Sequence, residues 1–223
     1  MTRGPLASQV RCGKVRAAFP KNMKRLLLIL GFVFTATSWL SAQSLTAEDR
    51  ARGVAHLERT REAFLAEVKG LSAEQLAFKA APERWSIAQV AEHIAASEDF
   101  LREMVEKQVF PAPPRTEEVN LHELDEFVTT AIADRSHKVQ APEPLAPTNR
   151  FGNVKESVAH FKESRAKTLA LMTDKADLRE HATDSPLGKK LDAYQWLLFI
   201  SAHCERHTKQ IAEVKTAPGY PKN

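Results

Sequence analysis

The sequence predicts an all-α protein, a four-helix bundle in which a long, partly helical crossover joins the second and third helices. Apolar residues recur at helical spacing in four segments after residue 46, and no segment alternates in the manner of a strand. Capping residues precede these segments, and glycine or proline follows several of them. The chain has 223 residues, 43% of them hydrophobic, which is enough apolar material for one domain with a sizeable core.

The first two helices have the clearest boundaries. Apolar side chains at helical spacing predict a helix over 46–69, which Gly70 ends. A second helix is predicted over 86–109, because Ser86 and Gln89 match a capping box. A cluster of three prolines follows this segment and stops the helix.

The second half of the chain is predicted to hold the crossover and two more helices. Residues 116–138 form an acidic helical segment between proline clusters, and we expect this segment to be the crossover. Asn153 and Glu156 stand in capping positions at the start of the third helix. The face of this helix that carries His160 also carries Ser157, Ser164 and Thr168, and we expect it to be solvated. The fourth helix is predicted over 192–215.

The basic charge of the chain is concentrated at its N-terminus. The formal net charge is +4, from 32 Lys and Arg against 28 Asp and Glu. Seven of the basic side chains and none of the acidic ones lie in residues 1–42, which leaves the rest with a net charge of −3. Because the body is mildly acidic, we expect no nucleic-acid partner.

Residues 1–44 are predicted to be a signal peptide with an upstream extension. Lys24 and Arg25 precede an apolar run over 26–34, and small residues follow near Ala42. The run is shorter than the roughly 20 residues that span a bilayer. We therefore expect an exported protein, periplasmic or secreted, with no stable membrane anchor after cleavage. The bundle is assigned to 45–217 and a C-terminal tail to 218–223.

His203 and His207 are the first candidate metal ligands. They are four residues apart on the fourth helix, so their rings lie on one face with Cβ atoms roughly 6 Å apart. Residues three, four or seven apart lie on the same face of a helix, so His203 and His207 share a face with the apolar residues Trp196, Ile200, Ile211 and Val214. The two rings are therefore predicted to be buried, where each needs a hydrogen bond or a metal to offset a desolvation cost of about a few kcal/mol.

His93 supplies the third nitrogen of the predicted site. It lies on an inward stripe of the second helix with Val90, Ser97, Phe100 and Met104. A lone pair of histidines at this spacing is a weak signal, and a single buried histidine is usually a satisfied core residue. Three inward histidines on two helices favour a metal, and three neutral ligands leave coordination positions open, as in catalytic sites. Gln89 and Ser97, one turn either side of His93, are second-shell or substrate-orienting candidates.

Several other chemistries are excluded by position. Glu205 lies two residues from His203 and from His207 and points to the opposite side of the helix, so it cannot be the base of a zincin-type protease. No paired Glu-x-x-His motifs, C-x-x-C-H motif or G-x-S-x-G motif are present. Cys12 lies in the predicted signal segment, so the mature chain has only Cys204, which we interpret as a small packed hydrophobe.

Two segments resemble the DinB-like four-helix-bundle family, which is related to bacterial thiol S-transferases and mycothiol-dependent maleylpyruvate isomerases. They are Trp85-Ser-Ile-Ala-Gln-Val-Ala-Glu-His93 and Trp196-Leu-Leu-Phe-Ile-Ser-Ala-His-Cys-Glu-Arg-His-Thr-Lys-Gln-Ile211. The resemblance implies one metal held by His93, His203 and His207. Zinc, nickel, manganese and iron all fit, and three imidazoles do not choose among them. Because the thiol-using relatives act in the cytoplasm, the export signal disfavours a bacillithiol or mycothiol co-substrate.

The leading hypothesis from the sequence is a metal-dependent enzyme that acts on a small-molecule substrate, either a hydrolase or a nucleophile or thiol transferase. The alternative is a non-catalytic metal-binding or stress-related helical binding module. A metal-free helical interaction protein is a third hypothesis. The sequence names no general base, and it leaves open whether the chain forms a homodimer.

Overall fold

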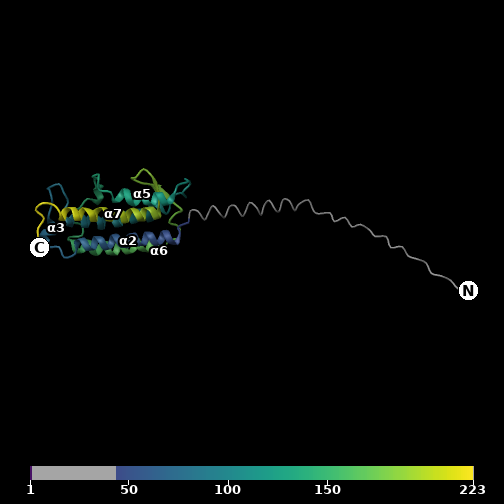
Figure 1. Cartoon of the computed structure of the whole chain (residues 1–223), viewed down its shortest axis with the longest axis horizontal. Coiled ribbons are helices and arrows are strands. Elements are labelled where there is room, and N and C mark those ends of the chain that lie inside the picture. The colour runs from purple at the N-terminus through teal and green to yellow at the C-terminus, as the bar shows by residue number, and fades with distance from the viewer. Residues whose placement is uncertain (2–43, 223) are drawn as a thin grey trace. The chain divides into compact units, whose positions relative to one another are not determined.

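The structure of the protein is a computed structural model, which describes Met1 and residues 44–222. The predicted signal peptide therefore lies outside the described residues, apart from its two end residues. Four long helices form the bundle: α2 (Ala47–Val68), α4 (Ile87–Met104), α6 (Val154–Asp174) and α7 (Ala193–Lys215). Between the second and third of these runs a long crossover that contains α5 (Leu121–Ala133). The predicted fold class is confirmed (Figure 1).

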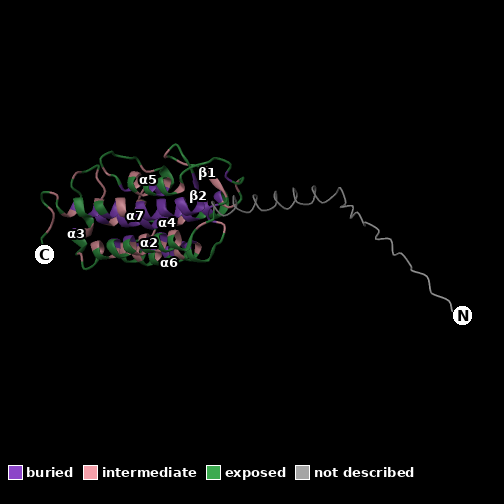
Figure 2. Cartoon of the chain, turned by 45° about the vertical axis from the view of Figure 1, so that its right-hand side comes forward, coloured by how far each residue is buried: buried purple, intermediate pink, exposed green. Residues whose placement is uncertain are grey.

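Each long helix has two principal neighbours in the bundle. Helix α2 packs against α6 and α7, and α4 packs against the same two helices. Helix α5 lies along α7 on the outside of the four (Figure 1). Because α7 is covered on three sides, most of its residues are buried, as are those of α4 (Figure 2). Among the described residues, no helix has the length and apolar character needed to cross a bilayer.

Side-chain caps begin all four long helices. The predicted capping box of α4 is present: the Ser86 hydroxyl accepts the backbone N–H of Gln89, and the Gln89 side chain accepts that of Ser86. Thr46, Asn153 and Asp192 accept from the third residue of α2, α6 and α7 in the same way. Such caps stabilise a helix by about 1 kcal/mol each, so the sequence defines where these helices start.

Several short elements were not predicted. The helix α3 (Ala73–Ala77) precedes α4, and the 3₁₀ turn η2 (Glu143–Leu145) ends the crossover. The predicted second helix does reach residue 109, but its last turn, η1 (Val105–Val109), is π-helical. Strands β1 (Ala182–Asp184) and β2 (Lys190–Asp192) form an antiparallel hairpin that pairs Thr183 with Leu191. The expectation that the chain contains no strand was wrong at this hairpin, because three residues are too few to show an alternating pattern.

A buried polar layer divides the core into two apolar clusters. One cluster gathers around Leu57, Leu101, Trp196 and Ile200, and the other around Phe64, Ile94, Phe161 and Ile211. Between them, the Arg165 guanidinium donates to both carboxylate oxygens of Glu98 at 2.7 Å. It also donates to the Thr60 hydroxyl at 2.9 Å, and that hydroxyl lies 2.9 Å from Ser201. All four side chains in this layer are buried.

The polar layer overturns two sequence predictions about which faces are buried. The face of α6 with Ser157, Ser164 and Thr168 is buried rather than solvated. Ser164 and Thr168 face α4, where they donate to Asp99 and Glu98. Phe100 on α4, which was predicted to be inside, is 48% exposed. Glu98 takes the interior position instead, since Arg165 neutralises its charge and satisfies its oxygens.

Candidate metal centre

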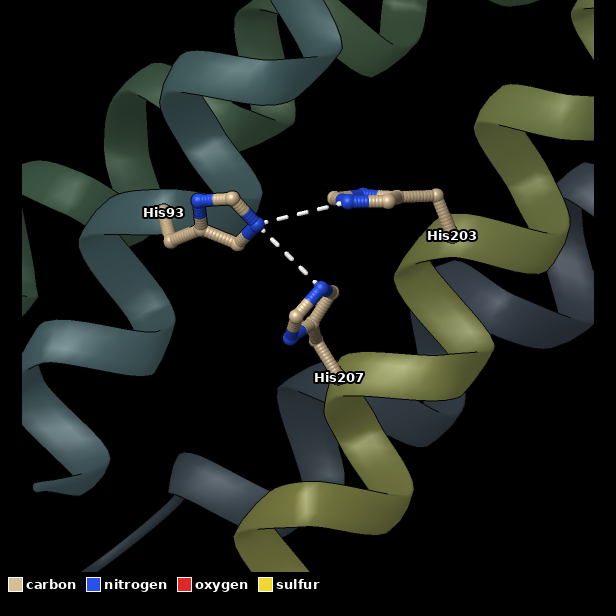
Figure 3. Close-up of side chains that lie close together, drawn as sticks. All are labelled: His93, His203 and His207. Carbon is tan, nitrogen blue, oxygen red and sulfur yellow. Dashed lines mark hydrogen bonds between the residues drawn. The ribbon is translucent and has the colours of Figure 1, made fainter. Parts of the chain in front are cut away.

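The ring nitrogens of His93, His203 and His207 converge on one point between α4 and α7. The Nε2 atom of His93 lies 3.3 Å from Nε2 of His203 and 3.2 Å from Nε2 of His207. One ligand atom from each residue lies within 4.8 Å of the other two. Figure 3 shows the three rings pointing toward one another, with His93 facing the two rings from α7. The structure therefore brings together all three residues that the sequence singled out.

The three imidazoles are neutral at physiological pH. His93 and His207 are buried, and His203 is half-buried. Burial lowers the pKa of His203 to about 3, with further lowering by His93 and Arg206. Burial also lowers the pKa of His93, and burial together with the two other rings lowers that of His207 well below its ordinary value. Neutral rings keep lone pairs available, and metal binding requires them.

In His93 and His207, a hydrogen bond from the Nδ1 atom fixes the tautomer of the ring. The Nδ1–H group of His93 donates to the Leu145 carbonyl at 2.9 Å. The Nδ1–H group of His207 donates to Oε1 of Gln210 at 2.8 Å. Each bond leaves Nε2 of the same ring unprotonated, with its lone pair toward the convergence point. Sequence reasoning missed both partners, although Gln210 lies three residues after His207 on the same helix face and could have been found.

Gln89 and Ser97, the two predicted second-shell or substrate-orienting residues, lie on α4 on either side of His93. The Gln89 side chain is engaged in the cap of α4. The Ser97 hydroxyl is buried and has no hydrogen-bond partner in the described part of the chain. No hydrogen bond within residues 44–222 connects either side chain to the three rings, and a substrate-orienting role stays a prediction.

Two consecutive residues of α4, Glu92 and His93, fasten the end of the crossover. The Glu92 carboxylate accepts the backbone N–H groups of Thr148, Asn149 and Arg150 at 2.8–3.0 Å. Burial opposes its ionisation, but these bonds hold the pKa of Glu92 below its ordinary value. The same segment supplies the Leu145 carbonyl that orients His93. The crossover therefore orients one ring of the candidate metal centre, and the sequence of the crossover gives no sign of this role.

Trp85, just before the cap of α4, packs beside the rings. Its ring centroid lies 4.9 Å from that of His93. It also stacks on His207 at 6.4 Å with an interplanar angle of 27°. An indole in this position keeps water away from one side of the convergence point, where low polarity strengthens interactions with charge.

The three nitrogens fit a transition-metal ion. In a tetrahedral site with metal–nitrogen distances of about 2.0–2.1 Å, neighbouring ligand atoms lie about 3.3 Å apart. The separations of 3.3 and 3.2 Å from Nε2 of His93 match that spacing. The ligand atoms of His203 and His207 lie within 4.8 Å of each other. The Nε2 atoms of His93 and His207 are both unprotonated, so no hydrogen bond can form between them. A cation placed between the two atoms would relieve the repulsion of their lone pairs. Imidazole suits zinc, nickel and iron alike, so the donor set does not name the metal.

The first prediction concerns the stability of the metal-free protein against pH. Because the pKa of His203 is lowered from 6.5 to about 3, the unfolded chain binds a proton below pH 6.5 that the folded chain does not. The stability that the neutral ring contributes is present above pH 6.5 and is lost as pH falls toward 3. The slope for His203 is about 1.4 kcal/mol per pH unit. Urea unfolding between pH 8 and 5 measures this slope, and an unchanged slope in His203→Gln would contradict the assignment.

The second prediction concerns the Gln210 amide. Replacing Gln210 by alanine removes the acceptor that orients His207, so the affinity for zinc is expected to fall about 10–100-fold. A competition titration with a zinc chelator measures the change. Lys209→Ala is the matched control, because Lys209 is an exposed neighbour on the same helix that pairs with Glu205. Equal zinc affinity in the two variants would show that Gln210 does not support the site.

Comparisons with known proteins agree with the fold, and the matched family region spans the three histidines. The sequence matches the DinB superfamily over residues 56–211. The uncharacterized protein YuaE of Bacillus subtilis (strain 168) is 30% identical over 150 residues, which cover 67% of this chain and 88% of that protein. The solved structure of YfiT from Bacillus subtilis, described as "a probable metal-dependent hydrolase with an unusual four-helix bundle topology", has a TM-score of 0.51 at 16% identity and covers 80% of this chain and 93% of its own. The chain belongs to the DinB superfamily.

Proposed function

We propose that this protein is a metal-dependent enzyme that acts on a small molecule, by hydrolysis or by transfer of a nucleophile such as a thiol. The convergence of the three imidazoles carries the proposal: two Nε2–Nε2 separations have the spacing of a metal-ligand set, and all three ligand atoms lie within 4.8 Å of one another. Leu145 and Gln210 hold two of the rings with their lone pairs toward that point. A structural site uses four protein ligands, whereas three leave a position for substrate, which favours an enzyme over a stabilising ion.

The residues of the chain have separate roles in the proposed site. His93, His203 and His207 would hold a divalent ion, which when bound supplies Lewis acidity that activates a nucleophile and polarises a substrate carbonyl. The hydrogen bonds from His93 and His207 to Leu145 and Gln210 raise the basicity of these rings and fix their orientation. Trp85 covers one side of the site and limits the access of water there.

The structural neighbour supports the hydrolase half of the proposal. YfiT, whose fold this chain shares, is described as a probable metal-dependent hydrolase. At 16% identity that likeness concerns the fold, so the choice between hydrolysis and transfer rests on experiment. Small-molecule substrates and action outside the cytoplasm are parts of the same proposal.

Elemental analysis followed by an activity screen tests the proposal. The purified protein is expected to contain about one transition-metal ion per chain and to turn over one of a panel of esters, amides and thiol acceptors. The variant with His93, His203 and His207 all changed to glutamine is the control, and it should lack both metal and activity. Metal without turnover in any assay would favour a non-catalytic metal-binding module instead. An equal metal content in the protein and the triple variant would remove the basis of the proposal.

A further inference from the structure

Arg206 lies between His203 and His207, the two α7 residues of the candidate metal centre, in the sequence. It follows His203 by three residues and directly precedes His207, so on a helix it shares the face of His203. Its side chain is half-buried, and one guanidinium nitrogen, Nη2, donates to the His137 carbonyl at 2.7 Å. Helix geometry places the Cβ atoms of Arg206 and His203 roughly 6 Å apart.

The neighbouring arginines are neutralised, and Arg206 is not. Arg135 forms a two-pronged ion pair with Glu213, with both nitrogen–oxygen distances at 2.6 Å. Arg150 pairs with Glu92 at 3.4 Å. Within residues 44–222, no carboxylate oxygen lies within 4.0 Å of the Arg206 guanidinium.

The two carboxylates that influence Arg206 from farther away are already engaged. Asp134 accepts the backbone N–H of Ser136 at 2.9 Å and its hydroxyl at 2.7 Å. Glu213 is held by Arg135. The guanidinium therefore keeps donor groups and a positive charge for another partner.

The metal centre adds to this positive charge. Imidazole binds a metal as a neutral ligand, so a divalent ion held by three histidines would bring two positive charges that no ligand cancels. A site with uncancelled charge of one sign attracts small molecules of the opposite sign. The planar fork of an arginine binds carboxylate and phosphate groups with two parallel hydrogen bonds.

We propose that the substrate of this site carries an oxyanion, either a carboxylate or a phosphate group, and that Arg206 binds it beside the metal centre. This proposal rests on the proposed function and narrows its substrate class. The competing explanation is structural: Arg206 would only hold the crossover segment around His137 against α7 through the observed hydrogen bond. A structural role affects charged and neutral ligands alike, whereas an oxyanion site discriminates between them.

Binding of small probes to the zinc-loaded protein and to the metal-free protein separates these explanations. Acetate and phosphate are the oxyanion probes, and acetamide is the neutral probe that matches acetate in shape. Calorimetric or NMR titrations are run on the unaltered protein, on R206Q and on R59Q. Arg59 is a suitable control because it is an exposed arginine on α2, so its removal causes the same change in net charge.

The unaltered protein and R59Q are expected to bind acetate or phosphate at least about tenfold more tightly than acetamide. In R206Q this preference should fall about tenfold, with zinc stoichiometry and acetamide affinity unchanged. The oxyanion that loses more affinity identifies the group. The proposal is overturned if R206Q keeps the preference, if it weakens all three probes by the same factor, or if the unaltered protein binds neither oxyanion.

Zinc content, measured in the same samples, separates failure of this proposal from failure of the metal function. Zinc bound by R206Q with an intact oxyanion preference would refute the oxyanion site and leave the metal centre standing. If the unaltered protein binds no zinc, and R206Q still loses the preference for oxyanions, the metal centre is refuted and the oxyanion site is supported.

Discussion

Replacing His207 by alanine is expected to lower the affinity for zinc by more than about 100-fold. Loss of a residue that only supports a ligand costs about 10–100-fold, and His207 is itself a ligand in this account. The substitution also leaves the Gln210 amide without the ring that it orients. Competition with a chromophoric zinc chelator measures the affinity, and circular dichroism shows whether the bundle remains folded.

The control for His207→Ala is the substitution His122→Ala. His122 is an exposed histidine on α5, where its side chain is 63% exposed and pairs with Glu126. Its removal should leave zinc affinity within about twofold of the unaltered protein, since exposed substitutions away from a site have small effects. The account would be contradicted if His207→Ala bound zinc as tightly as His122→Ala does.

Replacing Arg165 by methionine is expected to destabilise the fold by about 3–5 kcal/mol. The Arg165 side chain is fully buried and holds both oxygens of Glu98 at 2.7 Å. Without the guanidinium, the Glu98 carboxylate remains buried with its charge uncompensated, and the Thr60 hydroxyl loses a donor. Urea unfolding at pH 7 measures the loss in the free energy of unfolding.

Two further variants define the origin of that loss. Lys107→Ala removes an exposed ion pair with Glu103 on the same bundle and should cost at most about 1 kcal/mol. The double variant Glu98→Leu with Arg165→Met should recover much of the stability lost in Arg165→Met, because a buried ion pair can be replaced by apolar side chains with little net cost. If Arg165→Met cost no more than Lys107→Ala, the buried pair would not be important for the fold.

The long helices and the convergence of the three histidines could be predicted because their signals are local. Ser86 and Gln89 define the start of α4 within four residues of sequence. The four-residue spacing of His203 and His207 places them on one helix face, independently of how the helices of the bundle pack. His93 needed one further assumption, that α4 and α7 are neighbours, and the structure confirms this packing.

The remaining features depend on contacts between residues far apart in the sequence. Phe100 has the apolar character of a core residue, but Glu98 is buried in its place because Arg165 arrives from α6, 67 residues later. Leu145 accepts from His93 through its backbone carbonyl. Because every residue has such a carbonyl, the sequence does not indicate which one will bond to His93. Gln210 is the exception, because its position one turn after His207 would have indicated it.

A crystal structure of the zinc-soaked protein, with anomalous scattering recorded at the zinc edge, tests the central claim most directly. One anomalous peak is expected at about 2.0–2.1 Å from Nε2 of His93, His203 and His207. The Nδ1 atoms of His93 and His207 should still bond to Leu145 and Gln210. A soaked crystal whose zinc lies elsewhere on the chain, with the three rings joined only to one another or to water, would contradict the account.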